Sequence, residues 1–138
     1  MTETGILAAM LALILGVLAP AARAQPLPCP REISSNDACD VWEFEQADKE
    51  LTSIIELART KIDSFAHPDT REEAKERLNQ AHQLWRQTRE VDCQAESALM
   101  WLRSARTRQG YTASCMYELT VRRGDELKRR YRLPGSEK

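Results

Sequence analysis

Four cysteines are the residues of this sequence best suited to chemistry: Cys29, Cys39, Cys93 and Cys115. Cysteines either bind a metal such as zinc or oxidise in pairs to disulfides. Zinc sites usually contain a closely spaced Cys-x-x-Cys pair, which is absent here, and the two histidines lie far from the cysteines in sequence. If a short chain is exported, four cysteines instead indicate two disulfides. Three connectivities are open, and we expect the local one, Cys29–Cys39 with Cys93–Cys115, in which each bond joins a loop to a helix.

Signatures of catalysis are absent from the sequence. It contains no glycine-rich phosphate loop, no nucleophile elbow and no His-Glu-x-x-His motif. A Ser-His-Asp or Cys-His site would need His67, which lies in an expected turn, or His82, which lies beside an expected packing face. We therefore expect no enzyme, no bound cofactor and no metal.

The N-terminus has the layout of a secretion signal. Residues 6–18 are almost entirely apolar, and Ala22-Arg23-Ala24 provides a small-x-small cleavage pattern. The apolar run is short for a membrane span, although residues 1–5 contain Glu3 and no Lys or Arg, so an uncleaved N-terminal anchor stays open. We expect a signal peptide over 1–24 and a periplasmic or secreted product that starts near Gln25 and is not held in the membrane.

Charge is distributed unevenly along the exported part of the chain. Residues 25–102 contain 16 acidic and 9 basic residues, whereas residues 103–132 contain 9 basic and 3 acidic ones. Such a distribution favours electrostatic pairing, either between helices of the same chain or with a charged partner. The basic clusters near residues 122–130 are interrupted by acids and lack aromatic residues suited to base stacking, so we do not expect nucleic-acid binding.

Apolar spacing predicts three helices. They cover residues 38–65, 70–102 and 113–131, with a turn at Pro68 and a basic loop over 103–112. We expect an irregular segment over 25–37, one helical domain over 38–132 and a disordered tail over 133–138. The predicted fold is all-α: a small antiparallel three-helix bundle with a long central helix and two disulfides.

The helices should also position several polar residues. Asp48 occupies a gap in the apolar stripe of the first helix, and a carboxylate that faces a core needs a partner. Arg89 of the second helix is well placed to pair with Asp48 or with Glu96. The second helix carries one stripe with Leu78 and Trp85 and an adjoining stripe with Leu84, Val91, Ala95, Ala98 and Leu102, so we expect it to contact two neighbours.

From Leu78 to Leu127 the chain resembles the LprI-like lysozyme-inhibitor family of small exported bacterial proteins. The family pattern is met by Leu78, Ala81, Trp85, Arg89, Cys93 and Glu96, then by Cys115, Leu119, Thr120, Arg123 and Leu127. Upstream, Cys29, Cys39, Asp48 and Leu51 match its early elements, whereas Thr52, Asn79, His82 and Glu90 depart from its usual residues. The resemblance implies that the cysteines, Trp85 and the polar residues Asp48, Arg89, Glu96, Thr120 and Arg123 form a scaffold of core and ion-pair residues.

The resemblance also implies a function, inhibition of lysozyme-like peptidoglycan hydrolases by protein binding. The acidic surface over 37–76 could attract a basic lysozyme, or the basic loop over 103–108 could reach carboxylates in its cleft. No inhibitory residue carries over from the family pattern. The alternative is a periplasmic structural or adaptor protein that binds another envelope protein.

Overall fold

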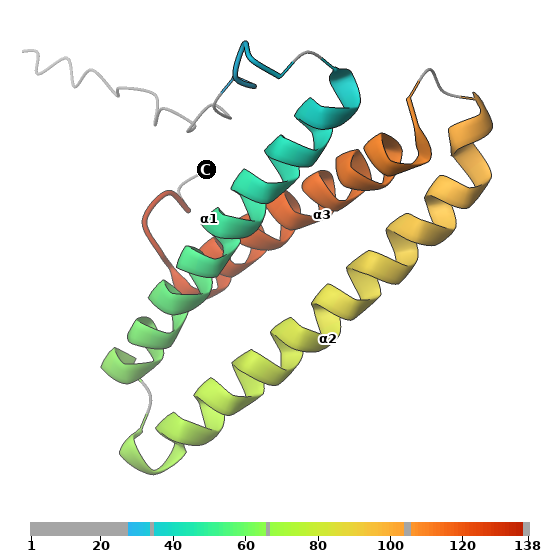
Figure 1. Cartoon of the computed structure of the whole chain (residues 1–138). Helices are drawn as coiled ribbons and strands as arrows, with labels where there is room; N and C mark the ends of the chain where they lie inside the picture. Colours follow the sequence, from blue (N-terminus) through green and yellow to red (C-terminus); the bar gives the residue numbers. More distant parts are fainter. Residues whose placement is uncertain (1–27, 34, 66, 104–105, 137–138) are drawn as a thin grey trace, which may run out of the picture.

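A computed structural model describes residues 28–33, 35–65, 67–103 and 106–136. Its helices are α1 (Asn36–Phe65), α2 (Pro68–Met100) and α3 (Arg108–Tyr131), with a short 3₁₀ turn, η1 (Trp101–Arg103), at the end of α2. Successive helices run in opposite directions (Figure 1), so the predicted antiparallel three-helix bundle is confirmed. The expected signal peptide lies outside the described residues. No helix in the described part of the chain is long and apolar enough to cross a membrane.

Each helix begins where a polar group satisfies its free N–H groups. Ser35 Oγ accepts a hydrogen bond from Ala38 N at 3.2 Å, and His67 O accepts one from Thr70 N at 3.0 Å. The third helix starts at Arg108, five residues before the predicted start, because Thr107 caps it by accepting a hydrogen bond from Gly110 N. The predicted loop over 103–112 is therefore much shorter in the structure.

The core lies mainly between α1 and α3, which cross closely, while α2 runs alongside them (Figure 1). A Cβ atom added at Gly124 would come within 3.0 Å of Ile54 Cδ1, which shows how closely α3 approaches α1. The buried cluster consists of Leu51, Ile54, Ile55, Ala58, Ile62, Leu78, Leu127 and Leu133. Five of these eight side chains come from α1, and four of the five, all except Ile54, belong to its predicted apolar stripe.

The chain after α3 differs from the predicted disordered tail. Arg132 adopts a left-handed conformation with φ of 51°, and Leu133 N donates to Lys128 O at 2.9 Å. This hydrogen-bonding pattern reverses the chain after a helix and turns the next apolar side chain back onto it. Leu133 is consequently buried in the core, so the tail prediction is wrong at this residue. Residues 137–138 of the predicted tail lie outside the described residues.

The second helix packs with one face only. Its buried residues are Leu78, Arg89, Cys93 and Ser97, whereas the adjoining apolar stripe is exposed: Leu84, Val91, Ala95, Ala98 and Leu102. As expected, α2 contacts two neighbours, α3 and α1, but it does so with one face, and the adjoining stripe takes no part in these contacts. The reason is geometric, because α1 and α3 form a single layer on one side of α2 (Figure 1).

Candidate protein-binding site

A buried arginine joins the three helices. The Arg89 side chain of α2 is 1% exposed, and its Nη1 donates to Asp48 Oδ1 of α1 at 2.8 Å. The same nitrogen donates to Thr120 Oγ1 of α3 at 2.7 Å. The guanidinium carbon also lies 4.9 Å from the ring centre of Phe44 and 5.0 Å from that of Trp85. Charge pairing, hydrogen bonding and cation–π contacts therefore converge on one side chain.

Further basic groups surround this network. Arg86 Nη2 approaches Asp48 Oδ2 at 3.4 Å, so the carboxylate has a second cation on its more exposed side. Arg123 of α3 lies 5.9 Å from the Trp85 ring centre and donates to Glu126 Oε2 at 2.8 Å. This hydrogen bond lowers the pKa of the Glu126 carboxyl.

His82 lies half-buried beside the same network. Its ring stacks on Trp85 with 5.9 Å between ring centres, and its Nδ1 is buried without a hydrogen-bond partner in the described part of the chain. Burial lowers the pKa of His82, and the positive charges of Arg86 and Arg123 lower it further. The side chain is thus held neutral within a group of cations.

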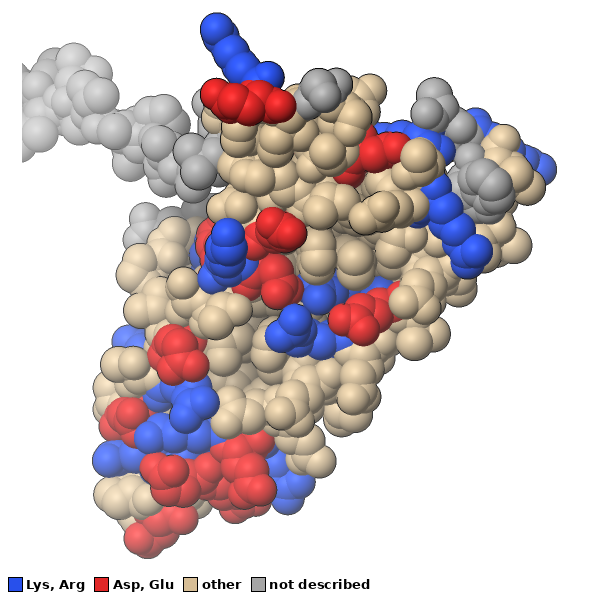
Figure 2. Space-filling view, viewed as in Figure 1, with Lys and Arg blue, Asp and Glu red and all other residues tan. Residues whose placement is uncertain are grey.

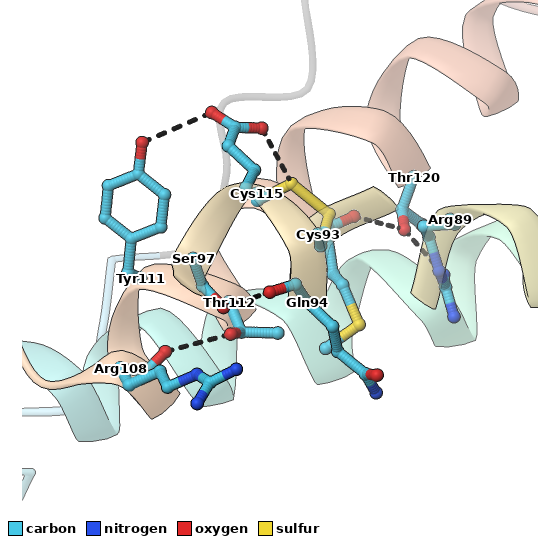
Figure 3. The surroundings of a disulfide bond; sticks show 11 residues. Arg89, Cys93, Gln94, Ser97, Arg108, Tyr111, Thr112, Cys115 and Thr120 are labelled. Atoms are coloured by element: carbon cyan, nitrogen blue, oxygen red, sulfur yellow. Dashed lines mark hydrogen bonds between the residues drawn. A yellow bond between two sulfur atoms is a disulfide. The ribbon is translucent and has the colours of Figure 1, made fainter. Parts of the chain in front are cut away.

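The disulfide Cys93–Cys115 links α2 to α3, and Cys29–Cys39 links the segment before α1 to its first turn. The predicted local connectivity is therefore correct. Glu96 lies beside the first of these bonds, whose surroundings Figure 3 shows, and contacts Cys115 and Tyr111 instead of Arg89. Its Oε1 accepts a hydrogen bond from the Tyr111 hydroxyl at 3.2 Å, and its Oε2 lies 3.5 Å from Cys115 Sγ. Of the two partners expected for Arg89, Asp48 is therefore the one that pairs with it.

Two acidic side chains of α1 bind the C-terminal end of the connection between α2 and α3, which comprises residues 101–107. Asp37 accepts hydrogen bonds from Thr107 N at 3.2 Å, and Asp40 pairs with Arg106 at 3.3 Å. Burial raises the pKa of the Asp40 carboxyl, while the positive charge of Arg106 opposes this shift. Gly110 makes the arrangement possible, because a Cβ atom there would collide with the Asp37 carboxylate.

An apolar hollow of about 430 Å³ opens between α1 and α3 next to this connection. Val41, Phe44, Ala113 and Met116 contribute to its floor and walls, and Arg108 lies on its lining. A hollow of this kind beside a cationic side chain can accept an apolar side chain of a protein partner. Sequence reasoning missed the hollow and the stacking of Phe44 on Arg89, because both depend on how α1 is rotated relative to its neighbours.

The described residues contain no group of three or more His, Cys, Asp or Glu side chains that could hold a metal ion. The chain matches the model of the lysozyme inhibitor LprI family over residues 29–127, and it belongs to that family. Comparisons with curated proteins and with solved structures gave no match.

Proposed function

We propose that this chain is an exported protein-binding inhibitor of lysozyme-like peptidoglycan hydrolases. Membership of the lysozyme inhibitor LprI family is the observation that carries the proposal. The two disulfides fit an oxidising compartment outside the cytoplasm, in line with the signal peptide expected over residues 1–24. A partner of this kind would be met in the cell envelope or beyond it.

The connection between α2 and α3 is the element best suited to enter a cleft. Arg103, at the end of η1, and Arg108, the first residue of α3, are exposed and make no ion pair within the described part of the chain. Such cations can pair with the carboxylates that line a glycosidase cleft. The contacts of Asp37 and Asp40 fix Thr107 and Arg106 at the C-terminal end of the connection, which reduces the entropy that these two residues lose on binding.

The acidic surface over residues 37–76 is the weaker candidate. Where α1 meets α2, acidic and basic side chains alternate (Figure 2), and many of them are paired. Lys75 lies between Asp63 and Glu72, and Glu73 pairs with Arg77. Residues 56–77 contain six acidic and five basic residues, so this end of the molecule offers little net negative potential to a basic enzyme.

The test is an inhibition assay in which oxidised protein is titrated against several lysozyme types. We expect inhibition with at least one type and a loss of about tenfold or more for the Arg103→Glu/Arg108→Glu variant, because both charges would then repel the cleft carboxylates. Arg129→Glu is the matched control, since it reverses an exposed arginine near the far end of α3. Full lysozyme activity at micromolar excess of inhibitor would contradict the proposal. In that case, recovery of a different envelope protein in a pull-down would favour the adaptor alternative.

A further inference from the structure

The outer face of α2 is apolar and has no neighbour in the described part of the chain. Leu84 and Val91 of α2 are 57% and 64% exposed, and Leu102 of the adjoining turn η1 is 74% exposed. Thr88, Ala95 and Ala98 lie on the same face and are exposed as well. The edge of the molecule formed by the middle of α2 carries few charged side chains, in contrast to the end where α1 meets α2 (Figure 2). An exposed apolar face of this length typically marks an interaction surface.

The spacing on this face is that of a coiled-coil seam. The six residues occupy positions 84, 88, 91, 95, 98 and 102, so that steps of four and three alternate throughout. Alternating steps of this kind keep one stripe of side chains turned toward a partner helix over several turns. None of the six residues is charged, and the flanking residues at 80, 87 and 94 are glutamines.

Two copies of this seam fit each other when the two helices run in opposite directions. In an antiparallel pair centred near residue 93, Leu84 would lie against the partner's Leu102, Thr88 against the partner's Ala98, and Val91 against the partner's Ala95. Large side chains would then meet at both ends, while the small residues between them allow the helix backbones to approach closely. A surface that matches its own reverse is what a two-fold symmetric dimer requires.

We propose that the outer face of α2 is the interface of a homodimer in which the two α2 helices pack antiparallel. This interface is separate from the connection assigned above to hydrolase binding. The part of the seam within α2, from Leu84 to Ala98, spans about 21 Å at 1.5 Å per residue, and Leu102 extends it into the 3₁₀ turn η1. Packing the seam against a second helix buries roughly 1,000 Å² in total, close to the lower limit for a specific interface, so the dimer is weak and forms in the micromolar range.

The charge of Asp92 distinguishes an antiparallel from a parallel arrangement of the two α2 helices. In the antiparallel arrangement Asp92 lies beside the two-fold axis and faces the partner's Asp92, while Gln94 faces the partner's Gln94 on the other side of the seam. In a parallel arrangement Asp92 would face the partner's Gln87 instead. Asp92 is exposed, so its replacement by asparagine removes the repulsion without disturbing the core.

Sedimentation equilibrium of the oxidised protein recovered from the periplasm of an expression host tests the proposal. We expect a reversible monomer–dimer equilibrium and a weakening of about tenfold or more in Val91→Glu, because the dimer would bury the new charge. Leu57→Glu is the matched control: Leu57 is 50% exposed but lies on α1, and its replacement should leave the equilibrium unchanged. Far-UV circular dichroism verifies that both variants are folded.

Asp92→Asn should tighten the dimer about two- to fivefold and reduce its dependence on salt. A protein that stays monomeric up to about 1 mM would overturn the proposal. Equal weakening by Val91→Glu and Leu57→Glu would overturn it as well, because the effect would then not belong to α2. A dimer whose affinity does not change in Asp92→Asn would refute the antiparallel arrangement.

Discussion

Removal of Asp48 should destabilise the protein more than removal of its partner Arg89. The two side chains form one ion pair, yet the Arg89 side chain is 1% exposed and that of Asp48 is 25% exposed. In Asp48→Leu the guanidinium keeps its hydrogen bond to Thr120 but stays buried without a carboxylate. Breaking a buried pair in this way typically costs about 3–5 kcal/mol.

Arg89→Met has a smaller expected cost. The remaining Asp48 carboxylate reaches solvent and still has Arg86 at 3.4 Å, while the Thr120 hydroxyl keeps its bond to Met116 O. Neither former partner of Arg89 is then left buried and unpaired. The methionine fills part of the space between Phe44 and Trp85. We expect a loss of about 1–3 kcal/mol, mainly from the missing charge-assisted hydrogen bonds.

Urea unfolding of the oxidised protein, followed by far-UV circular dichroism, measures these differences. The double variant Asp48→Leu/Arg89→Met should be at least as stable as Asp48→Leu alone, because the second change removes the unpaired charge that the first one creates. The coupling between the two sites should therefore reach about 2 kcal/mol. Additive effects, or a smaller loss in Asp48→Leu than in Arg89→Met, would refute the argument that burial of the guanidinium determines the cost.

Three further predictions concern the ends and links of the bundle. Leu133→Ala should lower the free energy of unfolding by about 2–4 kcal/mol in a urea titration, since Leu133 is buried in the core; a neutral effect would restore the predicted tail. Cys93→Ala/Cys115→Ala should cost about 3 kcal/mol in the same titration, because it opens a loop with a sequence separation of 22. The lowered pKa of His82 should make stability fall as pH decreases below about 6.5, where the unfolded chain binds a proton that the folded one resists. His82→Gln should reduce this dependence in unfolding curves recorded between about pH 7.5 and 5, and an unchanged slope would exclude His82 as its source.

The sequence predicted those features that depend on local spacing. The gap at Asp48 in an apolar stripe indicated a carboxylate that needs a partner inside the bundle, and the structure provides Arg89. Local pairing of the cysteines followed from the positions of loops and helices. These predictions succeed because a helix of known period fixes which residues share a face.

Other features depend on how the helices are rotated and how closely they approach one another. Spacing alone could not choose between Asp48 and Glu96 as the partner of Arg89. Gly110 was interpreted as a loop residue, whereas it lies in the first turn of α3 and accommodates the Asp37 carboxylate. Leu133 follows a helix end that is closed by a left-handed Arg132, a conformation that favours glycine and is therefore difficult to foresee for arginine.

The buried positions of the family pattern explain why a resemblance identifies the fold more readily than the partner. Arg89, Thr120 and Cys93 are almost completely inaccessible, so they cannot contact another protein directly. A binding partner meets exposed residues instead, and Arg103, Arg108 and Val91 are exposed residues that lie outside the pattern. Members that share this scaffold can therefore differ in their partners, and substitutions at the exposed connection should change inhibition while leaving the stability of the bundle nearly unchanged.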